Sequence, residues 1–260
     1  MKKAIVGMSL KNYINLPEES VKLASAIQSV AEEHTQEAEI FILPSIGTLE
    51  SVAEQLSNTK LGFGAQNISP KSNGAYTGEY SIETLDAIGG QYVEIGHFER
   101  RNYFNETDAM IKQKVELSLS FGMTAILCVG ERDENLTYSE LYTFLEGQLV
   151  GALQNINVED ADKLIIAYEP GWSIGKEQAA PNSHVWKTHE IIYTILKNNF
   201  DDIVANSIRL IYGGSVSKEN AYEITKSDHV DGVFVGRFGH KPENFETIVK
   251  AVLKNKAKGG

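Results

Sequence analysis

The 260-residue sequence has a formal net charge of −11, and 42% of its residues are hydrophobic and 23% charged. This is an ordinary globular composition at a length that suits a single α/β domain, and the acidic charge disfavours nucleic acid or an anionic membrane as the main partner. Because no run approaches the roughly 18 apolar residues of a membrane span and no secretory signal opens the chain, we expect a cytoplasmic protein.

Strand-like apolar runs alternate with amphipathic, helix-like segments along the sequence. The runs are Ala4–Gly7, Glu39–Pro44, Lys60–Ala65, Tyr92–Gly96, Thr124–Val129, Leu164–Tyr168, Arg209–Tyr212 and Gly232–Gly236. Alternating β and α segments predict a parallel sheet, and eight units at this length favour a closed (β/α)8 barrel over an open sheet. No linker interrupts the alternation, so residues 1–260 are expected to form one α/β domain.

Some helix boundaries can also be predicted from local residues. Thr137 and Glu140 have the spacing of a capping box, and Asn105 precedes an acidic first turn. We therefore expect helices to begin at Asn105 and at Thr137.

Ionisable residues and glycines collect directly after the predicted strands. In a parallel barrel these C-terminal strand ends form one rim, and the chemistry takes place there. The residues concerned are Lys11, Gln66, Asn67, His97, Glu99, Arg100, Glu131, Glu169, Gly213, Gly214, Ser215, Gly236 and Arg237. The sequence therefore predicts one site assembled from several strand ends.

Residues 164–176 carry the most informative part of this rim. Glu169 follows an apolar strand that Pro170 prevents from continuing, and Gly171 and Gly175 flank a loop around Trp172. A carboxylate under a hinged loop is suited to removing a proton from carbon away from water. An isolated Glu-Pro pair would equally fit a surface turn, so the interpretation depends on the other rim residues.

The last two strand ends indicate where an anion binds. Gly213-Gly214-Ser215 and Gly236-Arg237 let backbone N–H groups approach a phosphate in the region where barrels often form phosphate sites. A simple tight turn is the alternative interpretation of either segment.

Together these motifs resemble the triosephosphate isomerase family. E-I-G-H-F-E-R-R (94–101) resembles its histidine motif, and A-Y-E-P-G-W-S-I-G (167–175) resembles its glutamate and hinged-loop motif. Y-G-G-S-V (212–216) and D-G-V-F-V-G (231–236) match its two phosphate turns, and residues 65–79 resemble the loop through which its members dimerise. The resemblance runs in order over nearly the whole chain and implies a TIM barrel.

The resemblance also implies a role for each matched residue. Glu169 becomes the base that moves a proton between adjacent carbons, His97 polarises the carbonyl, and Lys11 supplies positive charge, a pattern known from this family itself. Glu99 and Arg100 are expected to support them as a buried acid and base pair. The residues expected to contact the substrate or its phosphate are Ser9, Gly175, Gly213, Gly214, Ser215, Gly236 and Arg237.

The sequence also allows predictions about cofactors and partners. No histidines or cysteines have metal-ligand spacing, and Cys128, the single cysteine, is expected in the core, so we predict no metal and no cofactor. The loop at residues 73–78 is expected to project with Tyr76 and Ile68 exposed until a second copy buries them, which predicts a homodimer.

The sequence departs from the family pattern around the expected substrate. Ser9-Leu10 replaces Asn-Trp, Phe98 replaces a serine, and Gly171 replaces a valine. The loop tip at residues 176–178 is one residue shorter, and Arg237 replaces the second glycine of the last turn. Since the three proton-transfer residues are kept, the pattern indicates retained chemistry with altered recognition.

The predicted function is interconversion of dihydroxyacetone phosphate and glyceraldehyde 3-phosphate through an enediolate. One alternative is the pair L-erythrulose 1-phosphate and D-erythrulose 4-phosphate, because isomerases of tetritol breakdown share the Gly-Arg turn. A second alternative is a non-catalytic paralogue that binds a phosphosugar. A barrel aldolase would need a Schiff-base lysine within a strand, and Lys163 only precedes one.

Overall fold

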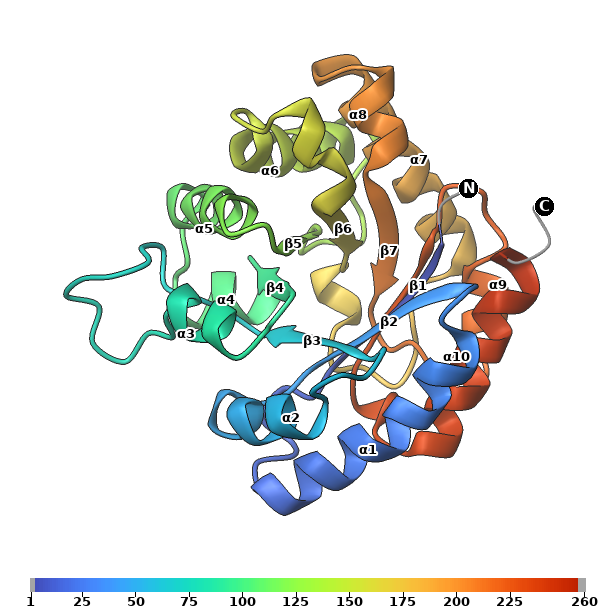
Figure 1. The fold of residues 1–260 in the computed structure, drawn as a ribbon. Helices are drawn as coiled ribbons and strands as arrows, with labels where there is room; N and C mark the ends of the chain where they lie inside the picture. Colours follow the sequence, from blue (N-terminus) through green and yellow to red (C-terminus); the bar gives the residue numbers. More distant parts are fainter. Residues whose placement is uncertain (1–2, 257–260) are drawn as a thin grey trace.

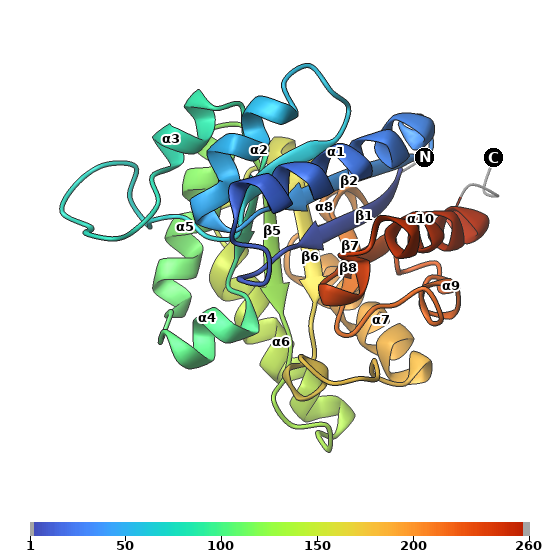
Figure 2. The same ribbon diagram turned by 90° about the horizontal axis from the view of Figure 1, so that it is seen from below.

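The computed structural model describes residues 3–256, and its strands close into a barrel in chain order. Every strand is parallel to its neighbours, and β8 pairs with β1 to complete the ring (Figures 1 and 2). The strands are β1 (Ala4–Ser9), β2 (Ala38–Leu43), β3 (Gly62–Ala65), β4 (Tyr92–Ile95), β5 (Thr124–Val129), β6 (Leu164–Tyr168), β7 (Arg209–Gly213) and β8 (Gly232–Val235). The TIM barrel expected from the sequence is confirmed.

Helices lie between successive strands and cover the outside of the barrel (Figure 1). The α-helices are α1 (Pro17–His34), α2 (Leu49–Gln55), α3 (Ile82–Ala87), α4 (Phe98–Tyr103), α5 (Asp108–Ser120), α6 (Tyr138–Leu153), α7 (Asn182–Asn199), α8 (Asp202–Ser207), α9 (Ala221–Ile224) and α10 (Pro242–Lys256). Short 3₁₀ turns are η1 (Ile46–Thr48), η2 (Val158–Lys163), η3 (Gly171–Ser173) and η4 (Arg237–Gly239).

The two faces of each strand are buried in different layers. Inward side chains fill the barrel in a separate apolar cluster, formed by Ile5, Phe41, Leu43, Tyr92, Ile126, Cys128, Ile165, Ala167, Ile211 and Phe234. Outward side chains such as Val6 and Ile42 pack with the helices in a larger cluster. Because both faces are buried, the strands are apolar runs without alternation, and the burial predicted for Cys128 is confirmed.

One predicted helix start is confirmed and the other is wrong. Thr137 and Glu140 form the expected capping box at the start of α6. Asn105 does not cap α5, because its backbone is in the left-handed region (φ 53°) and Thr107 accepts the capping hydrogen bond instead. Asn105 before an acidic turn therefore identified the helix but not its N-cap residue, which is Thr107.

Two further predictions concern membrane-spanning segments and the number of domains. Among the helices of residues 3–256, none has both the length and the apolar character needed to cross a bilayer. The prediction of a single domain over residues 1–260 extends beyond the described residues at both ends, and it stays a prediction.

Candidate active site

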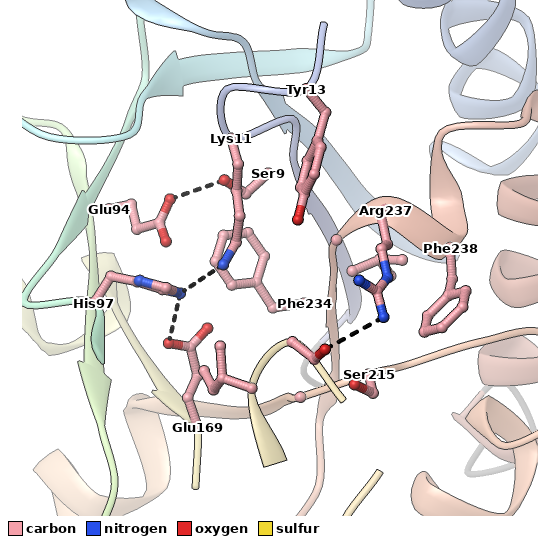
Figure 3. A pocket seen from close by; sticks show the side chains of 15 residues that line it. Ser9, Lys11, Tyr13, Glu94, His97, Glu169, Ser215, Phe234, Arg237 and Phe238 are labelled. Atoms are coloured by element: carbon pink, nitrogen blue, oxygen red, sulfur yellow. Dashed lines mark hydrogen bonds and ion pairs between the residues drawn. The ribbon is translucent and has the colours of Figure 1, made fainter. Parts of the chain in front are cut away.

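Lys11, His97 and Glu169 converge in one pocket at the C-terminal rim of the barrel, although they follow three different strands (Figure 3). His97 Nε2 lies 3.4 Å from Glu169 Oε2 and 3.4 Å from Lys11 Nζ. His97 and Glu169 are both buried, with 5% of each residue exposed. A carboxylate, an imidazole and an ammonium group therefore meet where bulk water is largely excluded.

His97 is held as a neutral ring with a defined proton position. It is the N-cap of α4, and its Nδ1 accepts a hydrogen bond from the Glu99 backbone N–H at 3.1 Å. That bond leaves the ring proton on Nε2, which faces the pocket. Burial and the nearby Lys11 ammonium lower the pKa of His97 well below 6.5. The ring is thus prepared to donate from Nε2 without carrying a charge.

Glu169 has the properties of a base that works near neutral pH. Burial raises its pKa from 4.5 to about 7, although the Lys11 charge and a hydrogen bond from the Cys128 thiol oppose the rise. Gly213 leaves room for the carboxyl group, because a Cβ at that position would lie 2.7 Å from Oε1. Glu169 Oε2 is buried and accepts no hydrogen bond within the described chain, so it is available to a substrate.

Lys11 is fixed by its backbone and by Glu99. Its φ of 45° lies in the left-handed region, a strained conformation for lysine. Its ammonium group donates to Glu99 Oε1 at 2.6 Å, and this carboxylate raises the pKa of Lys11 although burial opposes the rise. The predicted pairing of Glu99 with Arg100 is wrong, since Arg100 turns away and donates to Glu106 at 3.1 Å.

The opposite end of the pocket carries most of the residues predicted to bind phosphate. Gly175, Gly214, Ser215, Gly236 and Arg237 line it, whereas Gly213 lies beside Glu169. In this structure the turns hold the loop tip, because Ser215 Oγ and Arg237 Nη2 both donate to the backbone carbonyl of Lys176, at 2.6 and 3.1 Å. Five of the seven residues predicted to contact substrate or phosphate are therefore gathered at one end, with Ser9 at the other (Figure 3).

Comparison with known proteins gives the same assignment over almost the whole chain. A family model described as triosephosphate isomerase matches residues 4–252. The chain is 41% identical to "Triosephosphate isomerase 2" of Listeria innocua over 98% of its own length and 100% of that protein. It is 34% identical to "Triosephosphate isomerase" of Flavobacterium johnsoniae, over 97% and 100% of the two lengths.

The chain belongs to the triosephosphate isomerase family. As a member of this family it is an isomerase that acts on a sugar phosphate.

The hinged loop of this family member is anchored at its start by Trp172. The indole N–H donates to Glu131 Oε1 at 2.8 Å, and the same carboxylate accepts from Tyr168 at 3.0 Å. His184 Nε2 lies 3.2 Å from it. Burial alone would raise the pKa of Glu131, but the hydrogen bonds from His184, Trp172 and Tyr168 lower it. Glu131 therefore fixes the loop start as a buried carboxylate.

Two departures from the family pattern are explained by one contact. A Cβ at Gly171 would lie 2.1 Å from the ring of Phe98, so that ring fills the space in which a side chain at position 171 would stand. A valine at position 171 would require the Phe98 ring to move. We therefore expect the two substitutions to be coupled.

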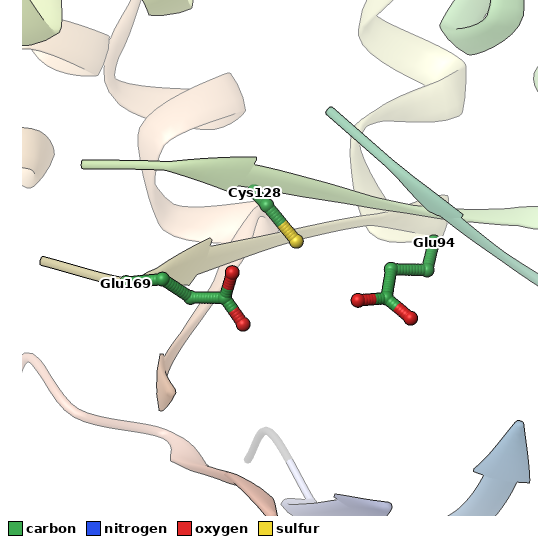
Figure 4. A group of neighbouring side chains, drawn as sticks. All are labelled: Glu94, Cys128 and Glu169. Atoms are coloured by element: carbon green, nitrogen blue, oxygen red, sulfur yellow. The ribbon is translucent and has the colours of Figure 1, made fainter. Parts of the chain in front are cut away.

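Glu94 is a site residue that the sequence reasoning missed. It lines the pocket from within β4, is 3% exposed, and accepts a hydrogen bond from Ser9 Oγ at 3.2 Å. With Cys128 and Glu169 it forms a buried group whose ligand-type atoms lie within 4.8 Å of one another (Figure 4). Burial and both carboxylates raise the pKa of Cys128, and a protonated thiol is a poor metal ligand. Glu94 could have been found from the sequence, because a charged residue inside the otherwise apolar strand β4 is unusual.

The projecting loop is only partly as predicted. The segment between β3 and α3 extends from the barrel in both views, and Tyr76 is 42% exposed (Figures 1 and 2). Ile68 is fully buried in the chain's own core, so the expectation that it is exposed was wrong. The chain folds inward at Ile68 before the loop projects.

Proposed function

We propose that this isomerase interconverts dihydroxyacetone phosphate and glyceraldehyde 3-phosphate. The observation that carries the proposal is the meeting of Glu169, His97 and Lys11 in one buried pocket, with a base of raised pKa beside two groups that can stabilise a negative oxygen. An α-proton of a hydroxyketone is only weakly acidic, so both a base and such groups are required.

The reaction we propose is a proton transfer between adjacent carbons. Glu169 removes the proton from the hydroxyl-bearing carbon, and the carbonyl oxygen becomes an enediolate oxygen near Lys11 Nζ and the Nε2–H of His97. Glu169 then returns a proton to the neighbouring carbon, while His97 moves the proton between the two oxygens. Atoms and electrons balance without an oxidant or reductant. The proposed step uses only Glu169, His97 and Lys11, in keeping with the prediction of no cofactor or metal.

The phosphate group belongs at the end of the pocket formed by Gly214, Ser215, Gly236 and Arg237. Arg237 is the strongest donor there because a guanidinium group can bind phosphate in a bidentate manner. Arg237 and Ser215 also bind the backbone of the loop tip, so the same two residues can contact both the closed loop and the phosphate. Their contacts with the phosphate would replace contacts that the shorter loop tip cannot make.

A second candidate substrate pair is L-erythrulose 1-phosphate and D-erythrulose 4-phosphate. Ser9 and Arg237, two of the departures from the family pattern, line the pocket itself, which supports altered recognition with the same proton transfer. A non-catalytic phosphosugar-binding paralogue would bind without turnover, and the assembled catalytic residues argue against it.

We also propose a cytoplasmic homodimer without nucleic acid or membrane as a partner. Two exposed aromatic side chains are candidates for burial by a second copy: Tyr76 on the projecting loop, and Phe104 after α4, which is 63% exposed. Light scattering at micromolar concentration tests this proposal, and a monomer would contradict it.

The test of function is turnover of both substrate pairs by the wild-type protein and by Glu169→Gln. General-base action typically contributes 10²–10⁴-fold, so we expect the variant to keep its fold by circular dichroism and to lose activity by about that factor. A variant with more than about a tenth of wild-type turnover would refute the role of Glu169.

A further inference from the structure

A second buried carboxyl group lies beside the catalytic base, and the proton transfer does not need it. Glu94 comes from the inner face of β4, and Ser9 is the only hydrogen-bond partner that residues 3–256 give it. That bond uses Oε2 alone. Oε1 accepts no hydrogen bond within residues 3–256 and is not among the inaccessible atoms that lack a partner, so it stays open to the pocket that Glu94 lines. A hydroxyl group of a bound ligand can therefore pair with it.

The position of Glu94 indicates which part of a substrate would supply that partner. Figure 3 shows Glu94 on the opposite side of the Lys11 side chain from Arg237 and Ser215, the end assigned to phosphate. Glu94 and Glu169 both belong to the buried group whose ligand-type atoms lie within 4.8 Å of one another. Glu94 is therefore adjacent to the carbon that loses its proton, at the end of the substrate remote from phosphate.

In a three-carbon ketose phosphate, that carbon is the end of the chain and carries a single hydroxyl group. A four-carbon ketose phosphate carries a hydroxymethyl group on the same carbon, directed away from the phosphate. We propose that Glu94 and Ser9 form a polar subsite for this terminal hydroxymethyl group, so that the enzyme accepts phosphorylated ketoses of four carbons. The inference rests on the proposed function, because it assumes the same phosphate end and the same base.

The chemistry at this subsite remains an isomerisation. Glu169 removes the proton from the carbon that carries the hydroxymethyl group, and a proton is returned to the former carbonyl carbon, so the ketone moves by one carbon. No carbon–carbon or carbon–oxygen single bond is broken, and no co-reactant is consumed. Glu94 takes no part in the transfer and only binds the terminal hydroxyl.

The protonation of the pair agrees with this assignment. Burial and the neighbouring Glu169 carboxylate raise the pKa of Glu94 to about 8, above the value of about 7 for Glu169. Because both pKa values are raised, the two neighbouring carboxyl groups share a proton near neutral pH. A neutral carboxyl group can both donate to and accept from a hydroxyl group.

The test compares the kcat/KM values for L-erythrulose 1-phosphate and dihydroxyacetone phosphate in wild type, Glu94→Leu and Glu94→Gln. In Glu94→Leu we expect the four-carbon to three-carbon ratio to fall at least about tenfold, the effect of losing a buried hydrogen bond. Glu94→Gln should recover much of the ratio, because its amide still bonds to a hydroxyl group. Glu190→Gln, an exposed carboxylate on α7, is the control whose ratio stays unchanged.

Calorimetry with two unreactive ligands, erythritol 4-phosphate and glycerol 3-phosphate, gives a readout that does not depend on turnover. We expect wild type to prefer the four-carbon ligand and Glu94→Leu to lose that preference. An unchanged ratio and preference in Glu94→Leu, or a wild type that neither turns over nor prefers the four-carbon compounds, overturns the subsite. A folded protein that shows the preference but isomerises neither substrate keeps the subsite and overturns the proposed function.

Discussion

Replacing Glu94 by glutamine should stabilise the protein, and the gain should grow with pH. The pKa of Glu94 is raised from 4.5 to about 8 in the folded protein, mainly by burial. Below pH 4.5 the carboxyl group is protonated in both the folded and the unfolded chain, so it contributes no penalty. As pH rises toward 8 the unfolded chain loses the proton first, and folding must restore it.

The size of this penalty follows from the difference of about 3.5 pH units between the two pKa values. At 1.36 kcal/mol per unit the difference corresponds to roughly 5 kcal/mol, fully developed above about pH 8. Because Glu169 shares the proton with Glu94, we expect an observed effect of about 2–5 kcal/mol. Glutamine has nearly the same shape and can still accept the hydrogen bond from Ser9, so packing should change little.

The assay is urea denaturation of wild type and Glu94→Gln at pH 5 and pH 8.5, at one protein concentration. The free-energy difference between the two proteins should be small at pH 5 and largest at pH 8.5. Glu190→Gln serves as the control for loss of one exposed negative charge. If the difference between Glu94→Gln and wild type changed by less than about 0.5 kcal/mol over this range, the reasoning on Glu94 would be refuted.

Three further outcomes are expected. Since Glu169 must be ionised to act as a base and its pKa is raised to about 7, kcat/KM should fall as pH decreases below about 7; an acid limb near 4.5 would contradict this. Gly171→Val should destabilise by about 1–3 kcal/mol in urea denaturation through overlap with Phe98, and adding Phe98→Ser should recover much of the loss; additive losses would argue against the coupling. Arg237→Ala should raise KM about tenfold to a hundredfold, with much of kcat retained, in steady-state kinetics; an unchanged KM would exclude a role in phosphate binding.

The barrel and the meeting of the three rim residues could be predicted from the sequence because both depend on local patterns, whereas the roles expected of these residues came from the resemblance to the family. Lys11, His97 and Glu169 each stand just after an apolar run, and parallel closure brings all such positions to one rim. No knowledge of side-chain contacts was needed for that step. The closing of the ring by β1 and β8 then places the first and last strand ends together.

Residues whose roles depend on contacts distant in sequence could not be predicted in this way. Glu94 lies inside a strand, and its partner Ser9 is 85 positions away, so no local spacing reveals the bond. The predicted partner of Glu99, Arg100, was wrong for the same reason, because the observed partner Lys11 is 88 positions away in the sequence. Ile68 appeared exposed because the projecting loop was read as one unit, whereas the chain first packs into the core.

The contact between Phe98 and Gly171 also restricts the order in which the two residues could have changed. Starting from the usual serine and valine, a mutation to phenylalanine first would place its ring within the volume of the valine side chain. A mutation to glycine first leaves only an unfilled space, which the phenylalanine ring can occupy later. Of the two possible orders, the one that passes through serine and glycine avoids the overlap, so the glycine at position 171 would have preceded the aromatic ring at position 98.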